Sequence, residues 1–219
     1  MSGSLRKGNW NAFARSISDY WMRSSGRNTG YRLVHIAVLG LAVLLPICPL
    51  QLFAALDSGE VDVTTGADGA IHAKAHLLFS AAPEIISALL TDYAHWPDLF
   101  EVRMRVASVT MQHGVATTDL RIEHALMPGE RRLITESRQF PDGRIVTDLA
   151  GGGDFKRYHR EWRLGAGATP NQTVADFELI VAIDTMVPDW MIALATRREL
   201  ESHFRIVKEK AARRATQER

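Results

Sequence analysis

PDWMIALATRRELESHFRIVKEKAARR, residues 188–214, contains no glycine and has its one proline at the first position. Charged residues cover much of the segment, and an apolar stripe is predicted along the rest, formed by Trp190, Leu194, Leu200, Phe204, Val207 and Ala211. This pattern predicts one long amphipathic helix. At about 1.5 Å per residue, the helix is about 40 Å long. A helix of this length needs a broad apolar surface to cover its stripe.

Upstream, the apolar residues repeat every two positions, which is typical of strands. The clearest case is the segment 71–79, IHAKAHLLF, which has one apolar face. Similar segments predict strands near residues 102–106, 118–126, 131–140, 145–149, 158–164 and 175–184. The segment 131–140 is polar, so we expect it at an exposed sheet edge. Turn sequences such as Pro141-Asp142-Gly143 separate the strands, which predicts antiparallel pairing.

Two helical segments follow the first strand, at residues 81–92 and 93–100. The order is therefore a strand, a short helical pair, six strands and the long helix. We predict an α+β fold, in which a curved antiparallel sheet of about seven strands wraps the C-terminal helix. Because a curved sheet and a straight helix do not touch everywhere, we also expect a space between them.

The N-terminal part of the chain has a different composition. Residues 1–56 hold six Lys or Arg and one Asp, whereas the remainder holds 20 Lys or Arg and 24 Asp or Glu. The run LVHIAVLGLAVLL, residues 33–45, opens an apolar stretch that continues to Leu56 and predicts an N-terminal hydrophobic helix. We interpret 1–32 as a basic segment and a candidate amphipathic helix, 33–56 as a signal peptide or membrane anchor, and 57–219 as the folded domain. A buried core helix is the alternative for 33–56.

The positive flank predicts a cytoplasmic N-terminus. The domain is then expected on the extracytoplasmic, or periplasmic, side of the membrane, anchored through 33–56 or secreted if the leader is cleaved. The net charge of the whole chain is only +1, so its composition gives no reason to expect a nucleic-acid partner.

Three short segments resemble those of a known family. They are LLTDYAHWP at 89–97, GDFK at 153–156 and EWRL at 161–164, followed by the helix after Val187-Pro188. In this order they resemble the START-like (SRPBCC, helix-grip) superfamily, in its polyketide cyclase/dehydrase and coenzyme Q-binding branch. The resemblance covers about residues 70–214. It implies a cavity between sheet and helix that binds or transports a hydrophobic small molecule such as a quinone, a lipid or a polyketide.

Strand parity selects the residues that would line such a cavity. Its entrance is expected near Tyr93, Trp96 and Phe100. The expected walls are Met104, Leu120, Ile122, Trp162, Phe177, Leu179, Val181, Trp190 and Leu194. Plain core packing is the alternative for each of these residues.

Two polar residues, His124 and Arg160, share the inward parity. An unpaired polar group in an apolar interior is costly, so each is expected to meet a partner, water or a ligand head group. His124 is also the one candidate for acid/base chemistry, which leaves an aromatase/cyclase-like enzyme as an alternative. A protein-interaction module without a ligand is a further alternative. No motif predicts a cofactor or a metal, because His72 and His76 lack a third ligand.

Overall fold

The computed structural model describes residues 60–217. The segments 1–32 and 33–56, together with the predicted N-terminal helix, lie outside the described residues. Within 60–217, no helix is both long and apolar enough to cross a bilayer.

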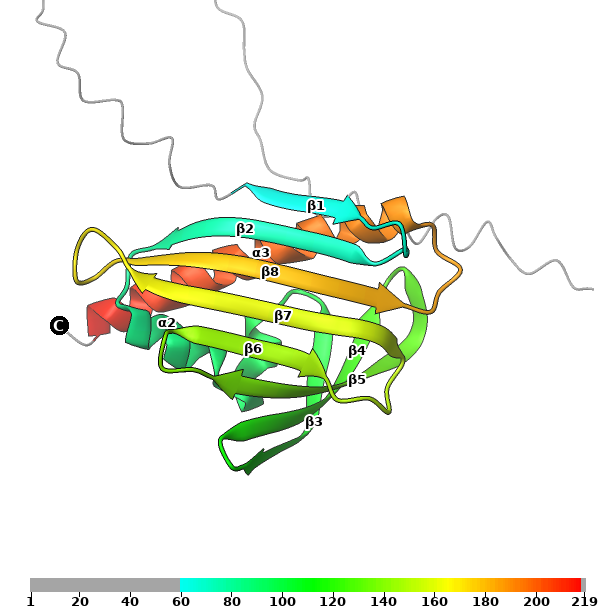
Figure 1. Cartoon of the computed structure of the whole chain (residues 1–219), viewed down its shortest axis with the longest axis horizontal. Coiled ribbons are helices and arrows are strands. Elements are labelled where there is room, and N and C mark those ends of the chain that lie inside the picture. The colour runs from blue at the N-terminus through cyan, green and yellow to red at the C-terminus, as the bar shows by residue number, and fades with distance from the viewer. Residues whose placement is uncertain (1–59, 218–219) are drawn as a thin grey trace, which may run out of the picture. The chain divides into compact units, whose positions relative to one another are not determined.

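Eight strands and three helical elements make up the described part of the chain (Figure 1). The strands are β1 (Val61–Thr65), β2 (Ile71–Phe79), β3 (Arg103–Gln112), β4 (Val115–His124), β5 (Met127–Gln139), β6 (Arg144–Leu149), β7 (Phe155–Ala166) and β8 (Thr173–Ile183). The helices are α2 (Pro83–Leu90), the 3-10 helix η1 (Tyr93–Leu99) and α3 (Asp189–Gln217).

The strands form one curved, open antiparallel sheet in the order β1-β2-β8-β7-β6-β5-β4-β3. The alternating sequence patterns predict about seven strands. They do not predict β1, which pairs with β2 from Val61↔Ala75 to Thr65↔Ile71. The reason is that β1 has only five residues and lies at a sheet edge, where just Val61 is buried. Its alternating pattern is too short to stand out.

The strand β5 is not at the edge, as its polar sequence predicts, but pairs with both β4 and β6. Its inward residues Thr135 and Ser137 are polar and yet 1% exposed. They are tolerated there because their hydroxyls bond to those of Thr118 on β4 and Thr147 on β6. A polar strand can therefore occupy the interior of a sheet when neighbouring strands supply matching hydroxyls.

Helix α3 crosses one face of the sheet and contacts β1, β2, α2 and η1 (Figure 1). We call this covered side the inner face and the opposite side the outer face. The buried residues of α3 are Leu200, His203, Phe204, Val207 and Ala211. They pack against the inward residues of the strands, so the hydrophobic core lies between α3 and the inner face.

Candidate functional site

Trp162 on β7 lies at the centre of the inner-face core and has no exposed surface. Its ring centroid is 4.8 Å from that of Phe177 and 5.6 Å from that of Phe204. Phe79 and His203 complete the cluster, at 6.4 and 6.1 Å. Buried tryptophans usually find a partner for the indole N–H. The Nε1 of Trp162, however, has no hydrogen-bond partner among the described residues.

Arg160 precedes Trp162 by two positions and therefore faces the same way, and it is only 5% exposed. Its guanidinium carbon lies 4.3 Å from the ring centroid of Trp96, a cation–π contact. Nη2 donates a long hydrogen bond of 3.4 Å to Thr147 Oγ1, and Nε has no partner among the described residues. No described carboxylate forms an ion pair with Arg160. A permanent charge therefore lies in the core without a counter-charge from residues 60–217.

Hydroxyl groups surround this charge. The register aligns Ser137, Thr147 and Arg160 in one row across β5, β6 and β7. Ser137 Oγ and Thr147 Oγ1 are 2.9 Å apart, and both side chains are essentially buried. Burial raises the pKa of Tyr93, while the charge of Arg160 and a hydrogen bond with Ser137 oppose that rise. Arg160 thus sits in a neutral, polar end of the core.

His203 on α3 contributes a second polar atom to the core. Its side chain is fully buried, its ring stacks on Phe100 at 4.3 Å, and Nδ1–H donates to the Leu99 carbonyl at 2.8 Å. Burial, with a smaller contribution from the charge of Arg160, lowers the pKa of His203 to about 3, although the hydrogen bond with the Leu99 carbonyl opposes this shift. His203 is therefore neutral with its hydrogen on Nδ1. Its Nε2 is an acceptor, and no described residue donates to it.

His124 at the end of β4 approaches α3 through Glu199, with 3.8 Å between Nε2 and Oε1. Its Nδ1 accepts the backbone N–H of Leu126 at 3.1 Å, so the neutral ring carries its hydrogen on Nε2. Burial lowers the pKa of His124 and raises that of Glu199, which the negative charge of Glu101 raises further. In this arrangement Nε2–H of His124 can donate a hydrogen bond. Action as a base at Nε2 requires the bond from Leu126 to break.

The structure buries most of the predicted site residues together. Trp96, Leu120, Trp162 and Phe177 are at most 3% exposed, and the remaining buried residues, at 8 or 9%, are Tyr93, Ile122, Leu179 and Val181. Phe100 and Met104 are half-buried against the same core. Tyr93 and Trp96, predicted at the entrance, thus lie inside, where Trp96 donates its indole N–H to the Leu90 carbonyl at 2.9 Å.

Trp190 and Leu194 do not line the inner face, because they are 67% and 40% exposed. The predicted stripe is wrong at this point. Leu200 lies six positions after Leu194, and at about 100° per residue that step turns the chain about 240° around the helix axis, beyond one full turn. Ile192 and Ala193 occupy the inward positions instead and pack against the core.

His203 and Glu199 are not among the site residues predicted from the sequence. A signal for His203 was present, because it lies three residues after Leu200 and four before Val207, within the apolar stripe of α3. A polar side chain at such a position indicates either a structural hydrogen bond or a binding role. The Nδ1 of His203 forms a structural hydrogen bond with the Leu99 carbonyl, whereas its Nε2 has no partner among the described residues. No comparable signal marks Glu199, whose neighbours in the sequence are charged.

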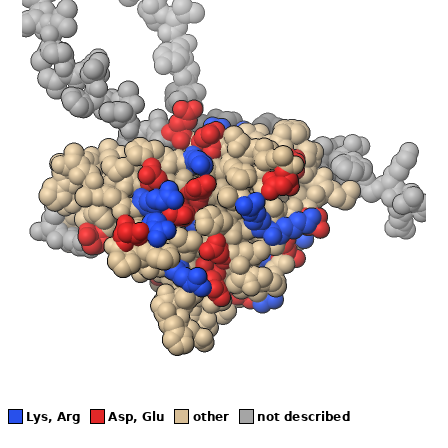
Figure 2. Space-filling view, viewed as in Figure 1, with Lys and Arg blue, Asp and Glu red and all other residues tan. Residues whose placement is uncertain are grey.

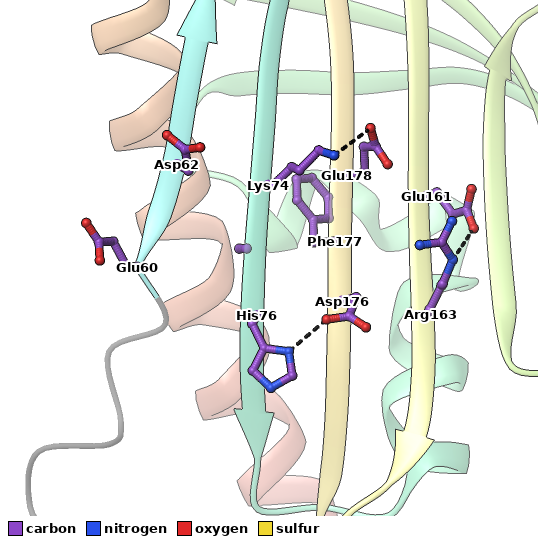
Figure 3. A pocket seen from close by; sticks show the side chains of 10 residues that line it. Glu60, Asp62, Lys74, His76, Glu161, Arg163, Asp176, Phe177 and Glu178 are labelled. Carbon is purple, nitrogen blue, oxygen red and sulfur yellow. Dashed lines mark hydrogen bonds and ion pairs between the residues drawn. The ribbon is translucent and has the colours of Figure 1, made fainter.

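The outer face carries a hollow of about 390 Å³ over β2, β8 and β7 (Figure 3). Six of the residues that line it form three pairs: Lys74 with Glu178 at 3.6 Å, His76 with Asp176 at 2.7 Å and Arg163 with Glu161 at 2.7 Å. Figure 2 shows acidic and basic side chains interspersed over this face. Such a surface does not suit an apolar ligand. The described residues also hold no group of three His, Cys, Asp or Glu placed to bind a metal ion.

Several solved structures resemble this one. The aromatase/cyclase Zhui from Streptomyces sp. R1128 has a TM-score of 0.56 at 14% identity, covering 66% of this chain and 95% of that chain. A START superfamily protein from Mycobacterium smegmatis has a TM-score of 0.52 at 18% identity, covering 65% and 97%. A STAR-related lipid transfer protein from Xanthomonas axonopodis has a TM-score of 0.52 at 11% identity, covering 69% and 98%.

No protein-family model and no curated protein matches the sequence. The structural likenesses nevertheless define the architecture. The chain has the START-like (SRPBCC) fold, in which an antiparallel sheet grips a long C-terminal helix. A fold alone does not define a function, which must be argued from the side chains of the site.

Proposed function

We propose that this protein binds or transports a hydrophobic small molecule between the inner face and α3, in association with a membrane. The candidate ligand classes are quinones, including coenzyme Q, lipids and polyketide-like compounds. The observation that carries the proposal is Arg160, a 5% exposed cation without a described counter-charge among apolar side chains.

A buried charge without a partner is strongly unfavourable, because it loses its hydration and gains nothing comparable in return. Stacking on Trp96 and a long bond to Thr147 recover only part of that loss. A bound carbonyl, phenol or carboxylate oxygen would supply the missing acceptor at Nε. An apolar ligand body would meanwhile contact Trp162, Phe177 and their neighbours, which matches the general composition of ligand sites.

The names of two structural neighbours support the same ligand class, since one is an aromatase/cyclase and another a lipid transfer protein. Membrane association is supported by the apolar stretch 33–56 and its basic flank. An apolar ligand partitions into the bilayer, so a tethered domain on the extracytoplasmic side would remain next to its source. Resistance of the full chain to extraction from membranes at alkaline pH tests this part of the proposal, and complete release would contradict it.

The binding proposal is tested with the full chain in lipid nanodiscs, titrated with 4-methylbenzophenone, an apolar molecule with one carbonyl acceptor. Quenching of tryptophan fluorescence should saturate at one ligand per chain, because Trp96 and Trp162 line the inner-face core. Empty nanodiscs provide the blank for partition of the probe into lipid. Quenching that rises linearly, as it does with the lipid alone, would contradict a defined site.

A further inference from the structure

We propose that the binding site between the inner face and α3, called the inner-face site, recognises a hydroxyl group of its ligand. This hydroxyl is held between Trp162 and His203. This inference rests on the proposed function, because it assigns a ligand chemistry to the same site. It concerns a second polar contact, separate from the acceptor that Arg160 requires.

The two residues offer complementary hydrogen-bonding atoms. Trp162 Nε1–H is a donor and His203 Nε2 is an acceptor, and neither atom has a partner among the described residues. Both side chains are fully buried, and their rings are neighbours, with centroids 6.1 Å apart at an angle of 61°. A hydroxyl is the smallest ligand group that accepts one hydrogen bond while it donates another. A carbonyl would satisfy only the tryptophan, and an ammonium only the histidine.

The acceptor on His203 is held in place. The bond from Nδ1–H to the Leu99 carbonyl and the stack on Phe100 fix both the tautomer and the orientation of the ring. Because burial lowers the pKa of His203 to about 3, Nε2 remains unprotonated at ordinary pH. The indole is held between Phe177 and Phe204. The donor and the acceptor are therefore organised before any ligand arrives.

The spacing of Arg160 and Trp162 sets the distance between the ligand's hydroxyl and the ligand's acceptor oxygen. Arg160 and Trp162 are two residues apart on the same face of β7, a separation of roughly 6.6 Å along a strand. A ligand that meets both contacts carries its hydroxyl on the far side of a ring from its carbonyl. A para-hydroxylated aryl ketone has this arrangement.

The test compares 4-hydroxybenzophenone with 4-methylbenzophenone, which differ only in a hydroxyl in place of a methyl group of similar size. Both are titrated into the full chain in lipid nanodiscs. We expect the hydroxyl compound to bind at least about tenfold more tightly, since the methyl compound leaves both buried atoms unpartnered. In His203→Phe the preference should fall to within about twofold, with the affinity for the methyl compound retained.

Trp162→Phe provides a second route to the same comparison if His203→Phe does not fold, as monitored by thermal unfolding. Equal affinity of the two probes for the wild-type protein would overturn the hydroxyl contact and leave the proposed function standing. A preference that survives in both variants would also overturn it. Failure of both probes to bind would contradict the proposed function itself.

Discussion

Replacing Arg160 with methionine should separate ligand binding from folding stability. The guanidinium is 5% exposed and has no described ion pair, so its removal relieves the desolvation of a buried charge. Replacing buried charged groups with apolar ones of similar volume is often neutral or stabilising by about 1–4 kcal/mol. The variant loses the cation–π contact with Trp96, worth about 2 kcal/mol when desolvated, and the weak bond to Thr147. We therefore expect the free energy of unfolding to stay unchanged or to rise.

Ligand binding should change in the opposite direction. A hydrogen bond from a charged donor contributes about 1.5–3 kcal/mol, so the affinity for 4-methylbenzophenone should fall by roughly 10- to 150-fold. Urea unfolding of the full chain measures the stability, and fluorescence titration in nanodiscs measures the affinity.

Arg163→Met is the matched control, since Arg163 lies on the same strand but faces outward. Its side chain is 55% exposed and pairs with Glu161 at 2.7 Å, so it should alter stability by about 1 kcal/mol or less and leave binding unchanged. Loss of more than about 2 kcal/mol of stability in Arg160→Met, with unaltered affinity, would refute the reasoning and make Arg160 a structural residue.

Three further predictions concern the core and one turn. Free histidine titrates near pH 6.5, whereas burial lowers the pKa of His203 to about 3, so the protein should lose stability as pH falls through that interval. In His203→Phe, urea unfolding should show this loss reduced by up to about 1.4 kcal/mol per pH unit, and an identical slope would contradict a neutral His203. The hydroxyls of Thr118 and Thr135 are buried and 2.7 Å apart, so replacing either residue with valine should lower the free energy of unfolding by about 1 kcal/mol or more. Replacing both should lower it by less than the sum of the two single changes, which a double-mutant cycle by thermal unfolding would measure. Gly143 has φ +84°, and a Cβ there would clash with the Leu164 carbonyl, so Gly143→Ala should cost at least about 1 kcal/mol in urea unfolding; an unchanged midpoint would argue against this turn.

The fold could be predicted from the sequence where patterns are long and one-sided. Residues 71–79 alternate without interruption, and α3 runs from Asp189 to Gln217 as the long segment without glycine or proline predicts. Prediction failed where tertiary pairing overrides local composition. The polarity of β5 suggests an edge, but Thr135 and Ser137 are satisfied by hydroxyls on neighbouring strands, which no local pattern reveals.

The site was harder to predict than the fold. The inward parity of Arg160 and Trp162 is visible in the alternation of β7, and the structure buries both. The exposure of Trp190 and Leu194 follows from helix phase, which a list of apolar residues does not capture. The partnerless state of His203 Nε2 depends on contacts with Leu99 and Phe100, about a hundred residues away in the chain. Such contacts require the three-dimensional structure.

Native mass spectrometry of the full chain, purified from cells without added ligand, gives the most direct evidence on whether the interior holds a small molecule. We expect a population carrying one apolar compound of a few hundred daltons, released by collisional activation and strongly reduced in Arg160→Met but not in Arg163→Met. A wild-type spectrum that shows only the bare chain under the gentlest conditions, together with no saturable uptake of 4-methylbenzophenone, would contradict the binding function.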